Sequence, residues 1–229
     1  MRYFLLSKAL AAILLTGLAF HSPHASAQEE PSRAFFTDSF SAGLDAWEML
    51  NPKSWQIREE DGAAVLVLRR PGKQRPPVRR PGEYALLRDR IWQDVTLTAR
   101  IHTLRSTKVK GRDVCILFGV QDETHFYYTH VCSDANGKTH NVIMKVKGTR
   151  RFPITRPKRP EARLTDEWHT VRVFHGRNGT ISVWLDDMET PLMTATDTDY
   201  TSGAVGLGSF DDPAEFDDVE VIGFRPVGR

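Results

Sequence analysis

The sequence contains little cysteine, no apolar run long enough to cross a membrane, and none of the short motifs of nucleotide or nucleophile chemistry. Two cysteines in 229 residues are too few for a disulfide-dense scaffold or a cysteine-rich zinc site. The P-loop, the dinucleotide-binding glycine fingerprint, the G-x-S-x-G elbow and the HExxH motif are absent. These absences argue against nucleotide-dependent enzymes, α/β-hydrolases and zinc proteases, and they predict no membrane span.

An excess of charge of one sign is also missing. The formal net charge is +2 at pH 7, which argues against nucleic acid as a partner. Basic residues gather in two proline-containing stretches, 69–82 and 145–163, whereas residues 178–224 hold eleven acidic residues and no Lys or Arg. Such blocks are commonly solvated loops, but they also suit a partner of opposite charge. An acidic polysaccharide held by the arginine-rich loops is therefore one hypothesis.

The first 27 residues have the pattern of a secretory signal peptide. Basic residues precede an uncharged apolar run, Ala9 to Phe20, and Ala25-Ser26-Ala27 supplies small residues for cleavage. The run is shorter than the about 20 residues that a transmembrane helix needs. We expect residues 1–27 to be a signal peptide, residues 28–229 to be a single exported domain, and the protein to be periplasmic or extracellular.

Alternation of apolar and polar residues with a period of two dominates the rest of the sequence, and it predicts strands. It is clearest in 65–68, 95–101, 114–120, 126–131, 142–146, 171–174 and 181–185. Many short strands separated by turn residues are typical of a β-sandwich or a barrel. We predict an all-β fold, a two-sheet antiparallel jelly-roll sandwich of the concanavalin A-like kind.

Two hairpins are well marked. Asn178-Gly179 is a strong signal for a tight turn between the last two of these strands. Residues 121–125 join the two central strands, and symmetric pairing about this turn places Cys115 opposite Cys132. In an exported protein, a facing pair of this kind predicts a disulfide.

Several segments resemble those of secreted jelly-roll domains. They are Phe40 to Trp47, Trp55 to Gly62, Phe118 to Tyr128, Trp168 to Val173, Gly203 to Phe210 and Phe216 to Val219. Together they cover most of residues 36–222 and are similar to the concanavalin A-like lectin/glucanase (laminin G-like) superfamily, nearest to the 3-keto-disaccharide hydrolase domain family. The resemblance implies a carbohydrate ligand. The matched positions are mostly turn glycines and core aromatics, which indicate fold more than chemistry, and the insertion at 69–82 departs from the pattern.

Alternation in the central hairpin separates two faces. One face is apolar and is expected to be core, while the other combines aromatic rings with amide, imidazole and cationic groups. Rings stack on the apolar faces of sugars and polar groups bond their hydroxyls, so this second face is predicted to be a glycan-binding groove on the concave sheet. The predicted ligand-binding residues, with those of neighbouring strands, are Arg100, His102, Gln121, Tyr128, His130, Asn141, Lys145, Arg172 and Trp184.

The sequence is compatible with an enzyme as well as with a binding module. A hydrolase acting on a 3-keto glycoside, which the resemblance implies, would need a base or a metal-bound water, and His130 and His140 are the first candidates for holding either. The segment Glu215 to Glu220 resembles the E-x-D-x-x-E signature of laminarinase-type glucanases. It fits a closing strand equally well, and glycosidases need two carboxylates placed across the scissile bond.

A structural calcium ion is the cofactor that the sequence suggests. Asp38 lies near the start of the domain, and Asp217 and Asp218 lie near its end. The terminal strands of jelly rolls often pair, which would bring these carboxylates together. Carboxylate oxygens suit Ca²⁺. The alternative is ordinary polarity at strand ends.

Overall fold

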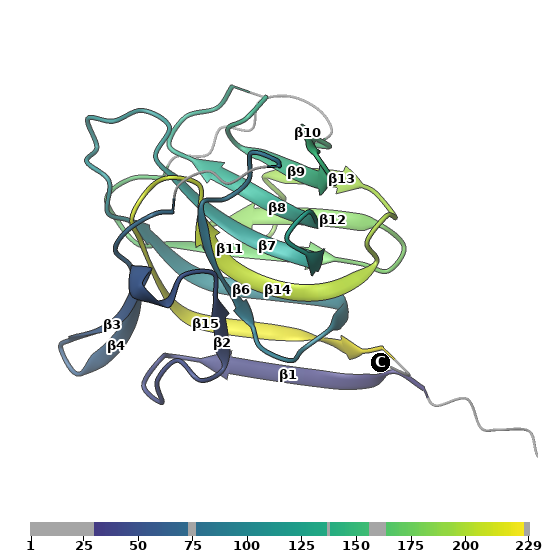
Figure 1. Cartoon of the computed structure of the whole chain (residues 1–229), viewed down its shortest axis with the longest axis horizontal. Helices are drawn as coiled ribbons and strands as arrows, with labels where there is room; N and C mark the ends of the chain where they lie inside the picture. Colours follow the sequence, from purple (N-terminus) through teal and green to yellow (C-terminus); the bar gives the residue numbers. More distant parts are fainter. Residues whose placement is uncertain (1–29, 73–76, 137, 156–163, 227–229) are drawn as a thin grey trace, which may run out of the picture.

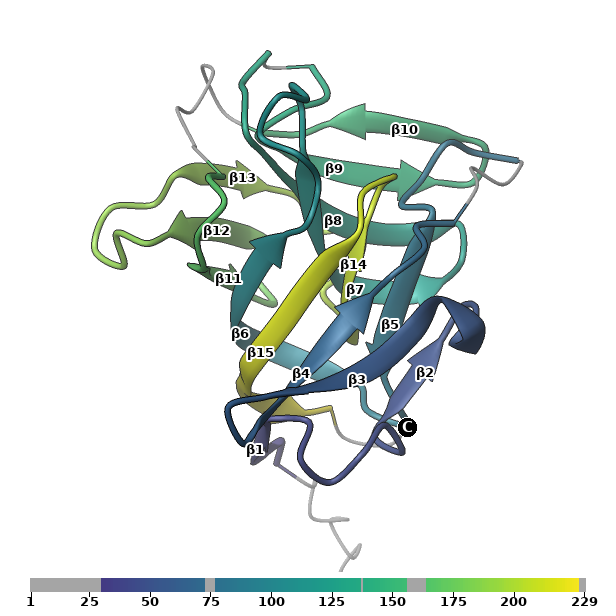
Figure 2. The same ribbon diagram turned by 90° about the vertical axis from the view of Figure 1, so that its left-hand side faces the viewer.

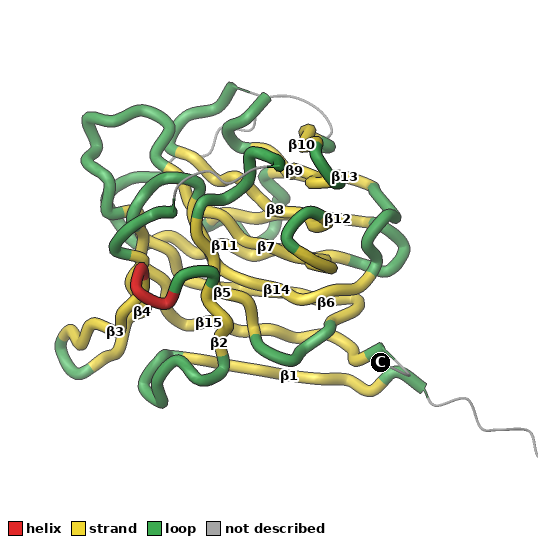
Figure 3. The backbone as a smooth tube through the Cα atoms, viewed as in Figure 1, coloured by secondary structure: helices red, strands yellow, loops and turns green. Residues whose placement is uncertain are grey.

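The computed structural model describes residues 30–72, 77–136, 138–155 and 164–226. Strands and loops make up nearly all of them, with one short 3₁₀ helix at Pro52–Ser54 (Figure 3). The strands are β1 (Ser32–Asp38), β2 (Trp47–Met49), β3 (Trp55–Glu60), β4 (Ala63–Leu68), β5 (Glu83–Leu87), β6 (Trp92–Thr103), β7 (Asp113–Asp122), β8 (His125–Cys132), β9 (Val142–Lys147), β10 (Arg150–Pro153), β11 (His169–His175), β12 (Thr180–Leu185), β13 (Met193–Thr196), β14 (Ser202–Ser209) and β15 (Ala214–Arg225). The predicted signal peptide, 1–27, lies outside the described residues. Within them, no helix is long and apolar enough to span a bilayer.

The strands form two antiparallel layers that fold over each other (Figures 1 and 2). Layer A has the order β1-β15-β6-β11-β12-β13, with β4 and β3 added beside β15. Layer B has the order β10-β9-β8-β7-β14-β5-β2. The layers join where Ser202 and Gly203 of β14 pair with β6. The predicted all-β jelly-roll sandwich is confirmed, and its first and last strands lie side by side (Figure 1).

The main core lies between the two layers. It includes Ile101 of β6, Ile116 and Phe118 of β7, and Phe216 of β15, all almost completely buried. Burial alternates along β6 and β11, as the period-two pattern predicts for strands with one face on the core. Every strand segment expected from the alternation lies within an observed strand.

The predicted turn of the central hairpin β7–β8 is correct, but the register beyond it is not. Asp122 pairs with His125 at the turn, and a bulge between Phe118 and Asp122 then shifts the remaining pairs by two residues. Gly119 lies in this bulge with φ of +58°, a left-handed conformation that glycine adopts without strain. The shift could not be read from alternation, because a two-residue slip keeps every side chain on its own face.

The shifted register separates the two cysteines. Cys132 lies opposite Asp113, and Cys115 lies opposite His130. Both cysteines are buried free thiols, so the predicted disulfide is not formed in the structure. The same register places Asp113, Cys115 and His130 beside one another.

A second apolar cluster covers the outer face of layer B. Leu117, Phe126 and Tyr128 are almost completely buried there. Val78, from the insertion at 69–82, and Phe210, which follows β14, belong to the same cluster. Over most of its area this face is therefore not the open groove that alternation predicts, because another part of the chain covers it.

Candidate functional site

The nine predicted ligand residues do not share one face. Arg100, His102, Arg172 and Trp184 lie on the outer face of layer A, since their positions alternate with the core residues of β6, β11 and β12. Tyr128 lies on the outer face of layer B, on the far side of the main core. The structure therefore divides the predicted groove between two surfaces of the sandwich.

The remaining predicted residues belong to layer B or its loops, in different settings. The ammonium group of Lys145 is bound by two aspartates on the other side of the layer. Asn141 is buried, and its side-chain oxygen accepts the backbone N–H at the end of β8 at 2.8 Å. Gln121 is exposed at the turn. Tyr128 and His130 share the outer face as predicted, but Tyr128 is completely buried.

His130 lines a pocket at one end of this outer face, which we call the His130 pocket. Its volume is about 330 Å³, near the lower end of the range of about 300–1,000 Å³ for small-molecule sites. Its charged and polar wall contains Arg79, Arg105, Lys110, His130, Thr139, His140, Arg151, Asp211 and Asp212. The pocket thus brings together residues of both arginine-rich stretches of the sequence.

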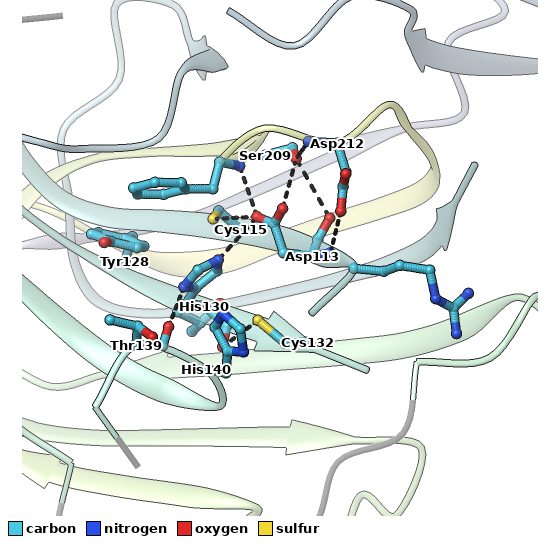
Figure 4. A network of polar contacts seen from close by, with 12 residues as sticks. Asp113, Cys115, Tyr128, His130, Cys132, Thr139, His140, Ser209 and Asp212 are labelled. Carbon is cyan, nitrogen blue, oxygen red and sulfur yellow. Dashed lines mark hydrogen bonds and ion pairs between the residues drawn. The ribbon is translucent and has the colours of Figure 1, made fainter. Parts of the chain in front are cut away.

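Asp113, at the start of β7, is the centre of a buried network behind the pocket (Figure 4). Its carboxylate accepts a hydrogen bond from the backbone N–H of Phe210 at 2.7 Å and lies 3.1 Å from Nε2 of His130. Burial raises the pKa of Asp113, but the hydrogen bond and charge of His130 outweigh it, and the pKa lies below its ordinary value. The carboxyl group is therefore ionised at neutral pH.

The second ring nitrogen of His130 is also engaged. Nδ1 donates a hydrogen bond to the carbonyl oxygen of Thr139. Both ring nitrogens of His130 therefore lie against oxygen atoms, one of a backbone carbonyl and one of the Asp113 carboxylate, and neither is free to contact a ligand. This arrangement does not suit the role of base that the sequence suggested for it.

His140, the other sequence candidate, is arranged differently. Its Nδ1 lies 2.7 Å from the carboxylate of Asp134, which orients the ring and leaves Nε2 as the other ring nitrogen. In the described part of the chain, Nε2 has no hydrogen-bond partner. Gly111 makes room for the ring: a Cβ atom there would lie 2.7 Å from Cε1 of His140. A histidine oriented by a carboxylate at the edge of a pocket can act as a general base.

Two aspartates follow β14 on another wall of the pocket. Asp212 accepts the backbone N–H of Asp113 at 2.9 Å, and its other oxygen lies 3.5 Å from Arg105. Burial and the charge of Asp113 raise the pKa of Asp212 to about 6. Burial and Asp113 also raise the pKa of Asp211. Asp212 can therefore hold and donate a proton in mildly acidic to neutral solution.

Four cationic side chains make the pocket positive, although Asp211 and Asp212 offset part of the charge. The guanidinium groups of Arg79 and Arg151 lie 5.0 and 4.6 Å from the centre of the Phe210 ring. Arg151 also donates a hydrogen bond to the hydroxyl of Tyr128 at 2.7 Å. Cations held in this way favour an anionic ligand or an oxygen that gains negative charge during a reaction.

The residues proposed for calcium do not form a three-carboxylate site. Both carboxylate oxygens of Asp38 accept N–H groups, from Phe40 at 2.7 Å and Trp47 at 2.8 Å. Asp38 and Asp218 line one surface hollow, and Asp217 does not. Among the described residues, the groups whose ligand atoms could hold one ion do not include these three aspartates.

Groups of metal-ligand type meet elsewhere, around Asp113. In the described ranges two such groups occur, Asp113–Cys115–His130 and Asp113–Asp211–Asp212, with ligand atoms within 4.8 Å of one another. In the first group the two ring nitrogens of His130 already lie against the carboxylate of Asp113 and the carbonyl of Thr139.

The glucanase-like segment lies on layer A. Glu215 and Asp217 face outward, and a register shift follows Asp217, in agreement with the pattern. Glu215 is only 1% exposed and is bound by Arg58 and His102. Burial raises the pKa of Glu215, but hydrogen bonds from His102 and Arg58 bring it below its ordinary value. Glu215 thus stays ionised and does not suit the role of a general acid.

Sequence reasoning missed most of the pocket. Asp113, Asp134 and Asp212 were not singled out, and Arg79 and Arg151 appeared only as members of basic stretches. The one available signal was the Asp211-Asp212 pair directly after a strand. It reads equally well as an ordinary polar turn.

Comparisons with known proteins agree with this fold. A sequence model of the 3-keto-alpha-glucoside-1,2-lyase-like domain matches residues 36–222. No curated protein matches the chain in sequence.

Solved structures are similar at low identity. The carbohydrate-binding module CBM66 from Bacillus subtilis is 16% identical with a TM-score of 0.55, and the alignment covers 76% of this chain and 94% of that one. Peanut lectin is 11% identical with a TM-score of 0.54, covering 86% of this chain and 100% of that one. These likenesses show the fold alone. Because the matched region in sequence spans most of the chain, the protein belongs to the family of 3-keto-alpha-glucoside-1,2-lyase-like domains.

Proposed function

We propose that the His130 pocket binds a sugar and that the protein cleaves a 3-keto glucoside there by elimination. The observation that carries the proposal is the presence, in one pocket, of His140, which Asp134 orients through Nδ1, and of Asp212 with a pKa of about 6. A base and an acid held in one pocket are what proton-transfer catalysis needs. The family description supplies the substrate class.

The chemistry follows from the ketone. A carbonyl at C3 acidifies the hydrogen on C2, and His140 takes this proton while the electron pair of the C2–H bond forms an enolate. When the enolate collapses, its electron pair forms the C1=C2 double bond and the C1–O bond breaks. The leaving oxygen takes the proton of Asp212. Arg79 and Arg151 supply positive charge for the enolate oxygen.

Turnover of 3-ketotrehalose tests this proposal, with product formation followed by mass spectrometry. We expect His140→Asn and Asp212→Asn each to lower kcat by about 10²–10⁴-fold, the usual contribution of a general acid or base. The control is His125→Asn, since His125 is exposed at the β7–β8 turn. Full turnover in folded His140→Asn would remove His140 from the mechanism, and a water-addition product in place of the unsaturated sugar would make the reaction a hydrolysis.

If the protein binds a glycan without cleaving it, the binding surface differs from the aromatic sheet face that the sequence predicts. Tyr128 is buried and presents no ring for stacking on a sugar, so the pocket must carry the binding. The four cations favour a second candidate function, the retention of an acidic polysaccharide. Binding of polygalacturonate that weakens steeply between low and high salt would support this function. Binding that is equally strong for neutral glucans would contradict it.

We also propose that residues 1–27 direct export and are removed. The support is the sequence pattern of a charged start, an apolar run and small residues. Mass spectrometry of the protein recovered from its own cell envelope and culture medium tests this. A cytoplasmic protein that begins at Met1 would contradict it.

A further inference from the structure

The described second part of the insertion at 69–82 lies on the outer face of layer B. This part, residues 77–82, is called the strap here. Val78 is 5% exposed and belongs to the same apolar cluster as Leu117, Phe126 and Tyr128. A loop that buries an apolar side chain in a sheet face is part of the packed structure, since leaving the face would expose that cluster to water.

The strap is held at Gly82 and at Arg80. At its base, Gly72 and Gly82 lie backbone to backbone, because a Cβ atom on Gly72 would lie 1.9 Å from the carbonyl oxygen of Gly82. The N–H of Gly82 also donates to the carbonyl of Phe210 at 3.1 Å. Toward the β7–β8 turn, Arg80 is 2% exposed and lies 2.6 Å from the carboxylate of Glu123. Arg80 donates a second hydrogen bond to the carbonyl oxygen of Glu123.

The strap divides the face into two hollows. Arg79 lines the His130 pocket, while the next residue, Arg80, binds Glu123 on the other side. Glu123 lines a second hollow of about 250 Å³ with Tyr84 and Val120, two members of the apolar cluster. The two hollows differ in charge: the His130 pocket carries four cations, and the charged lining of the second hollow is acidic, from Glu48, Asp122 and Glu123.

We propose that the strap makes the His130 pocket specific for the end of a glycan chain and excludes internal chain segments. This inference rests on the proposed function and adds the class of substrate. An internal segment of a glycan chain must extend from the pocket in two directions along the face. The strap, which the buried side chains of Val78 and Arg80 hold in place, blocks one of these directions. Val78, Arg80 and Glu123 are therefore positioning residues that set chain-end specificity without touching the reacting bond.

Two substrates with the same keto ring test the inference. One is 3-ketomaltotriose with the ketone in its non-reducing terminal ring, and the other is the same compound extended by two glucose units on O4 of that ring. We expect the wild-type protein to show a kcat/KM at least about 100-fold higher for the terminal keto ring. We expect two variants to lower this ratio of kcat/KM values at least tenfold, because turnover of the extended substrate rises. They are Arg80→Ala and Glu123→Ala, the latter at an exposed side chain.

Arg70→Ala is the matched control, because Arg70 is an exposed arginine at the base of the same insertion. Its ratio should equal that of the wild type, and thermal unfolding checks that each variant is folded. Equal turnover of both substrates by the wild type would overturn chain-end specificity while leaving the proposed function standing. A ratio unchanged in both folded strap variants would overturn the role of the strap. No turnover of either substrate would overturn the proposed function itself, and this inference with it.

Discussion

Replacing His130 with glutamine removes the positive partner of a buried carboxylate. The side chains of His130 and Asp113 are 5% and 1% exposed, so solvent screens their interaction little. Breaking a buried ion pair by removing one partner destabilises a protein by about 3–5 kcal/mol. Glutamine can still donate one hydrogen bond, so we expect the free energy of unfolding at pH 7 to fall by about 3 kcal/mol, a large part of the about 5–15 kcal/mol that a domain has.

The loss should depend on pH in a defined direction. In the wild type the pKa of Asp113 lies below the ordinary value of 3.8. Its stabilising contribution is therefore complete above that value and is lost as the pH falls through the folded-state pKa. In the variant, burial without the imidazolium raises the pKa of Asp113. Protonation then relieves the buried charge, and the difference between the two proteins should shrink as the pH falls from 8 to 5.

Urea unfolding followed by tryptophan fluorescence at pH 5, 6, 7 and 8 measures both effects. The control is His125→Gln, because His125 and its partner Asp122 are both exposed and a surface change usually alters stability by less than about 0.5 kcal/mol. A loss below about 1 kcal/mol at pH 7 in His130→Gln, or a loss independent of pH, would refute the charged pair.

Three further predictions concern other groups. Burial raises the pKa of the Cys115 and Cys132 thiols, so we expect neither to react with a thiol reagent in the native protein. Protein that is denatured without reduction should show two reactive thiols. No reactive thiol in the denatured protein would indicate a disulfide. Burial lowers the pKa of His175 from 6.5 to about 4, so its NMR titration midpoint should lie near 4 and stability should decline as the pH falls below 6.5; a midpoint near 6.5 would contradict its burial. Gly111→Ala should lower turnover of 3-ketotrehalose at least tenfold, because the added Cβ displaces His140 and the backbone at φ of +72° disfavours a side chain; unchanged turnover would contradict the contact.

Local patterns in the sequence were sufficient for the strands and the main core. Alternation identified the core faces of β6, β7 and β11, because the period of a strand is set by its own backbone geometry. Asn178-Gly179 marked the β11–β12 turn for a similar reason, since Gly179 has φ of +84°. The recurring glycines and aromatics then indicated the family, as they are the positions on which the jelly roll depends.

Tertiary structure alone decided the register of the central hairpin and the place of the site. The bulge at Gly119 moved Cys115 away from Cys132. The alternation pattern could not predict this, because a slip of two residues leaves it unchanged. Alternation also assigns a face without saying what covers it, so Tyr128 looked exposed although Phe210 and Arg151 lie against it.

The residues of the His130 pocket were also predicted in part from the sequence and decided in part by the tertiary structure. His140 was singled out from its residue type, but its base-like arrangement depends on Asp134 and on the space beside Gly111. The raised pKa of Asp212 depends on burial and on Asp113, which is 99 residues away along the chain. By itself the sequence determined the strands, the core and the family, because these depend on local periodicity. The acid, the base and the positive charge of the pocket were decided by the tertiary structure, because electrostatic coupling and burial act through space between segments that only the fold brings together.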